Sequence, residues 1–248
     1  MQIAFHTDPG IKRDENQDYV GAFTNKKGTV MVIVADGVTS TEGGEVASAM
    51  AVEHFGHAWE NTTIETIKLA ATWIAETTNH ENKVILEVGK RFDDLKTMAT
   101  TLVLAILFDE QVLIGNLGDS KAFLLHQDRL SQLSFDHNLK NELIRAGTVS
   151  QADAENVPNA NSVTRFLGVD EHANVEIKQY PFLGDDMLFL TSDGITKVLD
   201  SSSIKQVMRA ETSLNSRACE LIRAANSHGA PDNVTALLVS RSNKKDTK

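Results

Sequence analysis

The chain has 248 residues, of which 41% are hydrophobic and 23% charged, which excludes a largely disordered protein because such chains bury too little apolar surface. Its formal net charge of −10 argues against nucleic acid and anionic membranes as partners, since both are themselves negative. No apolar run approaches the ~18 residues that span a bilayer, and the N-terminus lacks the features of a secretory signal. Cys219 is the single cysteine and forms no internal disulfide, so we expect a cytoplasmic protein.

The first half of the chain predicts a buried strand, two helices and then a series of strands. Residues 30–35 form a short continuous apolar run, which is typical of a strand covered on both faces. Helical spacing of apolar residues follows at 44–55 and at about 62–92. The next runs have very short connections, which favour antiparallel strands because parallel strands need long crossovers. These runs are residues 101–108, 112–116, 122–125 and 130–133.

The second half of the chain begins with a polar segment and then returns to strands and helices. The expected elements are, in chain order, a polar stretch at 138–160 with a short helix around 141–145, a buried strand at 188–191, helices near 201–210 and 214–227, and a final strand at 234–239. Runs of strands and pairs of helices predict an antiparallel α+β fold with helix layers outside packed sheets.

Aspartates recur at the ends of the predicted strands, namely Asp18, Asp36, Asp119, Asp193 and Asp232. Asp-Gly is a common turn pair, so a single instance such as Asp36-Gly37 favours an ordinary turn. Repetition after long apolar runs instead indicates that the carboxylates converge at one edge of the sheet core. Converging carboxylates repel one another unless a cation neutralises them, and hard oxygen ligands suit Mg²⁺ or Mn²⁺.

Other common catalytic patterns are absent from the sequence. The histidines are dispersed and form no zinc-binding motif, and neither a Walker-type loop nor a G-x-G-x-x-G motif occurs. The G-x-S-x-G motif of serine hydrolases is also absent. Cys219 lies on a predicted amphipathic helix, where a packing role is a better interpretation than a nucleophile.

Short motifs surround each of the five aspartates. They are, in chain order, Arg13-Asp14-Glu15-Asn16-Gln17-Asp18, Val34-Ala35-Asp36-Gly37, Gly118-Asp119-Ser120, Ser192-Asp193-Gly194 and Asp232-Asn233-Val234-Thr235. One such motif is weak evidence. The full ordered set, over about residues 2–240, resembles the bacterial metal-dependent Ser/Thr protein phosphatases of the type 2C (PPM) family.

The resemblance implies a β-sandwich of two antiparallel sheets flanked by pairs of antiparallel helices. It also implies a single catalytic domain over residues 1–242, with a small flap at about 138–164 beside the active site. Residues 243–248 are expected to form a disordered tail, and the protein to be a monomer. Phosphorylated proteins are the implied partners, together with a Hanks-type Ser/Thr kinase whose action the phosphatase reverses.

The resemblance assigns most of the aspartates to a centre with two divalent cations, Mn²⁺ or Mg²⁺. In the family pattern Asp36 bridges the two ions, and the Gly37 carbonyl binds the second. Asp193 and Asp232 hold the first ion. The implied reaction is hydrolysis of phosphoserine and phosphothreonine by a metal-bridging hydroxide, which two cations make available near neutral pH.

The remaining motif residues have implied roles around that centre. Asp18 orients water from outside the ligand set, and Asp119 helps Asp193 to hold a weaker third ion. Arg13 binds the substrate phosphate, because a guanidinium grips two phosphate oxygens at once. Without the resemblance, an exposed charge beside a strand is the better interpretation of Arg13.

Several positions depart from the family pattern without removing a proposed ligand. Thr39 and Ser40 stand where glycines are usual, and Ala99 and Lys121 replace a glycine and an arginine. Val38 lies near the position of a histidine acid in animal members and has no proton to donate, so the sequence identifies no general acid. His137 is interpreted as capping a turn.

Two other functions remain open at this point. One is a metal-dependent phosphohydrolase acting on small molecules, against which the flap argues mildly. The other is a pseudophosphatase that binds phosphoproteins, against which the retained aspartates argue.

Overall fold

The structure is a computed structural model that describes residues 1–38 and 43–241. Its strands form two five-stranded antiparallel sheets. From edge to edge, the first sheet consists of β1 (Gln2–Asp8), β10 (Val234–Ser240), β9 (Met187–Thr191), β6 (Lys121–His126) and β7 (Arg129–Gln132). The second consists of β2 (Asp18–Thr24), β3 (Val30–Asp36), β4 (Leu102–Leu107), β5 (Gln111–Leu117) and β8 (Glu176–Pro181).

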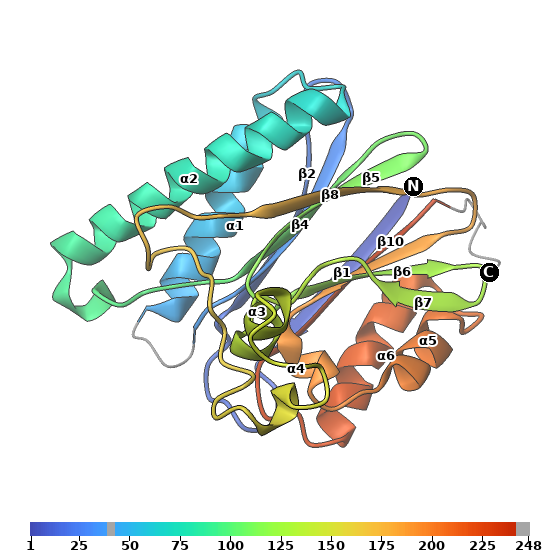
Figure 1. Ribbon diagram of the computed structural model, residues 1–248. Helices are drawn as coiled ribbons and strands as arrows, with labels where there is room; N and C mark the ends of the chain where they lie inside the picture. The colour runs from blue at the N-terminus through green and yellow to red at the C-terminus, as the bar shows by residue number, and fades with distance from the viewer. Residues whose placement is uncertain (39–42, 242–248) are drawn as a thin grey trace.

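Helices cover the outer faces of the sheets, as Figure 1 shows. The second sheet packs against α1 (Gly44–Glu60) and α2 (Ile67–Arg91), and the first against α5 (Ser201–Met208) and α6 (Leu214–Ser227). The short elements are the helices α3 (Leu139–Arg145) and α4 (Asp193–Thr196) and the 3-10 turns η1 (Asp93–Leu95) and η2 (Ala154–Asn156). The predicted α+β sandwich with outer helix pairs is therefore confirmed.

The central strand β3 shows why its sequence is apolar throughout. Val32 and Val34 lie in the core between the two sheets. Met31 and Ile33 point the other way and pack under α1 and α2. Because successive side chains of a strand point to opposite faces, a strand covered on both faces needs a continuous apolar run. This is the burial predicted for residues 30–35.

The strand β8 has no counterpart among the predicted elements. It pairs with β5 at the edge of the second sheet, and its sequence Glu-Ile-Lys-Gln-Tyr-Pro is mostly polar and at most partly buried. An edge strand has one unpaired side and tolerates Pro181 at its end, so it carries no strong apolar signal. The predicted helix at 62–92 also begins later, at Ile67, because Thr66 accepts a hydrogen bond from the Leu69 N–H and caps the helix.

The segment predicted as a flap, residues 138–164, contains α3 and η2. Its two ends are held side by side where the Leu139 N–H donates to the Ser162 carbonyl at 2.9 Å. Next to this bond, the Thr164 N–H donates to the His137 carbonyl at 2.9 Å. The segment therefore leaves and rejoins the sandwich at one place. The predicted extent of the domain stays a prediction, and the predicted tail, like Thr39 and Ser40, lies outside the described residues.

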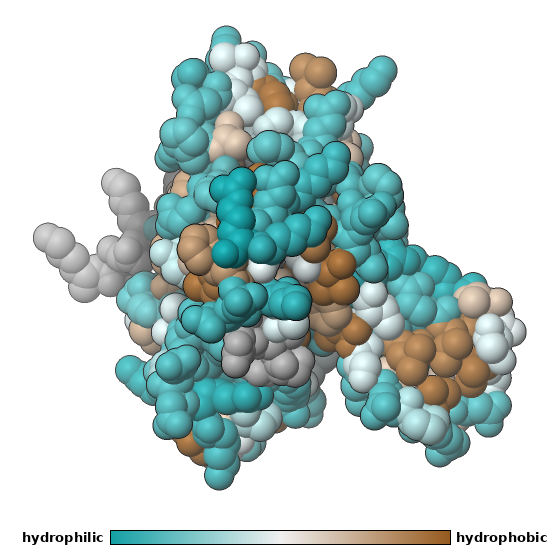
Figure 2. All heavy atoms as spheres, turned by 90° about the vertical axis from the view of Figure 1, so that its left-hand side faces the viewer, coloured by the Kyte–Doolittle hydropathy of each residue, from teal (hydrophilic) through white to brown (hydrophobic). Residues whose placement is uncertain are grey.

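The surface is mostly hydrophilic. Figure 2 shows the face on the left-hand side of Figure 1, on which hydrophobic residues form separate patches within a hydrophilic surface. Among residues 1–38 and 43–241, no helix combines the length and the apolar character needed to cross a membrane.

Candidate metal centre

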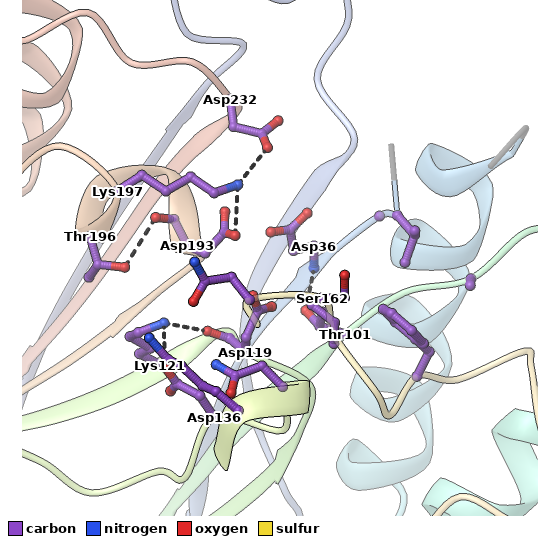
Figure 3. A pocket seen from close by; sticks show the side chains of 18 of the residues that line it. Asp36, Thr101, Asp119, Lys121, Asp136, Ser162, Asp193, Thr196, Lys197 and Asp232 are labelled. Carbon is purple, nitrogen blue, oxygen red and sulfur yellow. Dashed lines mark hydrogen bonds and ion pairs between the residues drawn. The ribbon is translucent and has the colours of Figure 1, made fainter. Parts of the chain in front are cut away.

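Five aspartates line a single cavity of about 880 Å³, and four of them are motif aspartates, namely Asp36, Asp119, Asp193 and Asp232. Figure 3 shows their side chains directed into the same space. Asp36 is the last residue of β3, and Asp119 lies in the connection from β5 to β6. Asp232 lies just before β10, whereas Asp193 is the first residue of α4 and not the end of a strand as its motif indicated. The structure thus brings together carboxylates from both sheets.

Asp18 is buried beside this cavity. The antiparallel register of β2 and β3 places it opposite Asp36. Its Oδ2 accepts hydrogen bonds of 2.6 Å from the hydroxyl groups of Ser192, just after β9, and Thr235, within β10, both strands of the other sheet. Its Oδ1 is buried without a hydrogen-bond partner. Asp18 therefore links the sheets through one oxygen and keeps the other for the site.

The backbone around Asp36 is held by two threonines. The Asp36 N–H donates to Thr101 Oγ1 at 3.1 Å, and Thr100 Oγ1 donates to the Asp36 carbonyl at 3.0 Å. At the next residue, a Cβ on Gly37 would lie 2.4 Å from the carbonyl oxygen of Gly44, so no side chain fits there. Sequence reasoning did not assign these threonines this positioning role.

His137 positions the loop that carries Asp119. The Gly118 N–H donates to His137 Nδ1 at 3.1 Å, and the His137 N–H donates back to the Gly118 carbonyl at 3.0 Å. The ring is fully buried, and burial, followed by the charge of Arg165, lowers the pKa of His137. A neutral imidazole that accepts at Nδ1 carries its proton on Nε2, which faces Glu176 at 3.5 Å. These contacts agree with the predicted turn-capping role.

Crowding makes the carboxylates costly to ionise in the absence of a cation. Burial and then the charge of Asp18 raise the pKa of Asp36 well above its ordinary value. Burial and then the charge of Asp193 raise the pKa of Asp119 to about 7. Burial also raises the pKa of Asp18 to about 6, against the two hydroxyl hydrogen bonds that lower it. Bound cations would favour the charged forms of all three groups.

Basic side chains already contact two of these carboxylates. Lys197 Nζ lies 2.7 Å from Asp193 Oδ2 and 2.9 Å from Asp232 Oδ2. Although burial opposes its charge, the two aspartates raise the pKa of Lys197. Arg13, the predicted phosphate ligand, is not among the residues that line the cavity, and its Nε lies 3.0 Å from Asp232 Oδ1. Lys121 forms an ion pair of 3.0 Å with Asp136 at the other side of the cavity.

Sequence reasoning missed Lys197. Its one signal is the spacing of four residues from Asp193, which places two side chains on the same face of a helix. That spacing has meaning only once Asp193 is known to begin α4, whereas the motif indicated a strand end.

The donor set suits a hard divalent cation. It consists of carboxylate and carbonyl oxygens, and Asp193 Oδ1 is buried without a hydrogen-bond partner, as is Asp18 Oδ1. Across the described part of the chain, no three acidic, histidine or cysteine side chains are arranged to hold an ion as they stand. The residues therefore fit a metal by their chemistry, although their carboxylates are not directed at one point as they stand.

Comparison with known proteins agrees with these observations. A family model described as Protein phosphatase 2C matches residues 11–238. The serine/threonine phosphatase stp of Listeria innocua is 40% identical over 242 residues, which cover 97% of this chain and 96% of the relative. The solved structure of the S. agalactiae serine/threonine phosphatase has a TM-score of 0.90 and 31% identity, covering 96% of this chain and 98% of that one. The catalytic domain of the phosphatase PstP, solved in complex with two manganese ions, has a TM-score of 0.80, covers 96% of each chain and, at 23% identity, supports the fold alone.

Proposed function

This chain belongs to the protein phosphatase 2C family of metal-dependent enzymes, and we propose that it hydrolyses phosphoserine and phosphothreonine in proteins. The observation that carries the proposal is the set of four aspartates around one cavity, with a buried carboxylate oxygen that has no partner. Serine/threonine phosphatases among the relatives support the choice of substrate. A Hanks-type kinase as partner, a monomeric state and a cytoplasmic location stay predictions.

We assign the divalent ions, Mn²⁺ or Mg²⁺, to the aspartates as the motifs indicate. Asp36 is proposed to contact both core ions and the Gly37 carbonyl the second, while Asp193 and Asp232 hold the first. Asp119 is proposed to hold a weaker third ion together with Asp193. When bound, such ions supply a nucleophile from water near neutral pH and neutralise charge on the phosphoryl oxygens.

The surrounding residues prepare this chemistry. Asp18 has one carboxylate oxygen held by Ser192 and Thr235, so its second oxygen has a defined direction from which to orient water. Thr100 and Thr101 hold the backbone of Asp36, which fixes the start of its side chain. Positioning of this kind lowers the barrier because the groups do not have to reorganise during the reaction.

The first prediction concerns the metal itself. Phosphatase activity on a phosphothreonine peptide should disappear after chelation and return when Mn²⁺ or Mg²⁺ is added. The reason is that bound divalent ions are needed to neutralise the phosphate dianion beside so many carboxylates. The measurement is phosphate release with a titration of each metal. Parallel assays on a phosphotyrosine peptide and on phosphorylated metabolites test the choice of substrate. Full activity after metal removal verified by elemental analysis would contradict the mechanism.

The second prediction concerns Arg13. Arg13→Ala should raise KM for a phosphopeptide about 10- to 100-fold, because a charged hydrogen bond contributes roughly 1.5–3 kcal/mol. The affinity for Mn²⁺ should change less, although Arg13 contacts Asp232. Arg13→Lys, which keeps the charge without the planar fork, should give an intermediate KM. An unchanged KM in Arg13→Ala would leave Arg13 as a surface charge that pairs with Asp232.

A further inference from the structure

Lys197 occupies the space between two proposed metal ligands. Its Nζ is within hydrogen-bonding distance of both Asp193 and Asp232, at 2.7 and 2.9 Å. Figure 3 shows the lysine side chain extended across the cavity with its ammonium group between the two carboxylates. The side chain is 40% exposed, so it has room to move away.

An ammonium and a divalent ion compete for these oxygens. A divalent cation takes carboxylate oxygens at about 2.0–2.6 Å, closer than the lysine nitrogen lies now. Two cations bound to the same pair of oxygens would repel each other strongly in a partly buried site. Asp193 Oδ1 has no hydrogen-bond partner and is available to an ion. At Asp232, however, one oxygen contacts Lys197 and the other contacts Arg13, so Asp232 has no oxygen to offer while both contacts persist. Binding of the ion therefore requires that the lysine leave.

We propose that Lys197 is an internal counter-ion that neutralises Asp193 and Asp232 in the metal-free protein and is displaced when the first divalent ion binds. This inference rests on the proposed metal site. Lys197 thus does not contact the substrate and acts on the metal site through the carboxylates of Asp193 and Asp232. It stabilises the metal-free protein and weakens the binding of the ion, so the site fills only when the divalent ion is concentrated enough to displace the lysine.

The test compares Mn²⁺ affinity in the metal-free full chain, measured by calorimetry. Lys197→Met keeps the length of the side chain and removes its charge, and should bind Mn²⁺ about 10- to 100-fold more tightly, since a charged hydrogen bond no longer has to break. Lys197→Arg keeps the charge and should bind Mn²⁺ like the original chain. Should Lys197→Met fail to fold, Lys197→Gln makes the same comparison.

Thermal melting of the metal-free protein separates this role from a purely structural one. Lys197→Met should melt at a lower temperature than the original chain without metal, yet gain more stability from saturating Mn²⁺. If Lys197 only supported the structure, Lys197→Met would both lower the melting temperature and weaken Mn²⁺ binding. The matched control is Lys140→Met, because Lys140 lines the same cavity but pairs with Glu155 at 2.8 Å. Its Mn²⁺ affinity should be unchanged.

Asp193→Asn distinguishes the two ways in which the inference can fail. If Asp193→Asn loses the first ion while folded Lys197→Met binds Mn²⁺ no more tightly than the original chain, the lysine's role is overturned and the metal site stands. If Asp193→Asn binds Mn²⁺ normally, the assignment of the metal site is wrong, and the inference falls with it.

Discussion

Asp36→Asn should reduce phosphatase activity by about 10²- to 10³-fold or more, because removing one preorganised charged group from an active site has effects of that size. Asp36 is the one aspartate proposed to contact both core ions, so its loss should lower the affinity for each of them. Activity on a phosphothreonine peptide and calorimetric binding of Mn²⁺ test both statements. Near-normal turnover with normal Mn²⁺ affinity would remove Asp36 from the site.

An aspartate outside the cavity provides the matched control for this substitution. Asp186 is 3% exposed and accepts a hydrogen bond from His126, and it is not among the residues that line the cavity. Asp186→Asn removes a buried carboxylate that lies outside the cavity and should leave Mn²⁺ binding unchanged. A difference between the two variants therefore reports on the metal site and not on the general cost of removing a buried charge.

Asp36→Asn should also change how the stability of the metal-free protein depends on pH. The raised pKa values of Asp36, Asp18 and Asp119 mean that the folded chain holds more protons than the unfolded chain. The contribution of these three groups to stability then falls as the pH rises from the ordinary carboxyl pKa of 3.8 through about 7. Asp36→Asn removes one of these groups, so its melting temperature should fall less steeply over this range. Melting curves at a series of pH values measure the slope.

Asp119→Asn should separate leaving-group chemistry from binding of the core ions. Asp119 lies in the connection between the sheets and is proposed to hold the weaker third ion. A cation there would help the leaving oxygen to gain its proton, which is a role that the side chain of Val38 cannot fill. The loss of rate should be about 10²- to 10⁴-fold on phosphoserine or phosphothreonine, whose alkoxides are poor leaving groups, and much smaller on an aryl phosphate.

Metal counting and parallel rates test this prediction. Calorimetry should still find the two core ions in Asp119→Asn. Equal losses of rate on the peptide and on the aryl phosphate would refute the leaving-group role. Loss of the two core ions would instead place Asp119 within the core site.

The sequence predicted most of the fold because most of its signals are local. The apolar run at 30–35 requires a strand with two covered faces, and β3 is such a strand. The edge strand β8 was not predicted, because a strand with one unpaired side and a polar sequence carries no strong apolar signal. The resemblance to type 2C phosphatases, carried by the ordered aspartate motifs, is confirmed by the match over residues 11–238.

The site was predictable to a lesser extent. Motifs selected the aspartates that the structure brings together, but they gave no view of the groups that contact them. The contact of Lys197 with Asp232 joins residues 35 positions apart in sequence, and no periodic pattern encodes it. Likewise, the hydroxyl groups of Ser192 and Thr235 reach Asp18 only because two sheets pack face to face.

The placement of the carboxylates on both sheets has a consequence for the integrity of the chain. Asp18 and Asp36 belong to strands formed early in the sequence, whereas Asp232 precedes the last strand, and β10 lies between β1 and β9. A fragment that ends before Asp232 therefore loses a proposed ligand together with β10, an interior strand of the first sheet. Proteolytic removal of the chain from Asp232 onward should abolish metal binding, so divalent-ion binding reports on whether this last segment is in place.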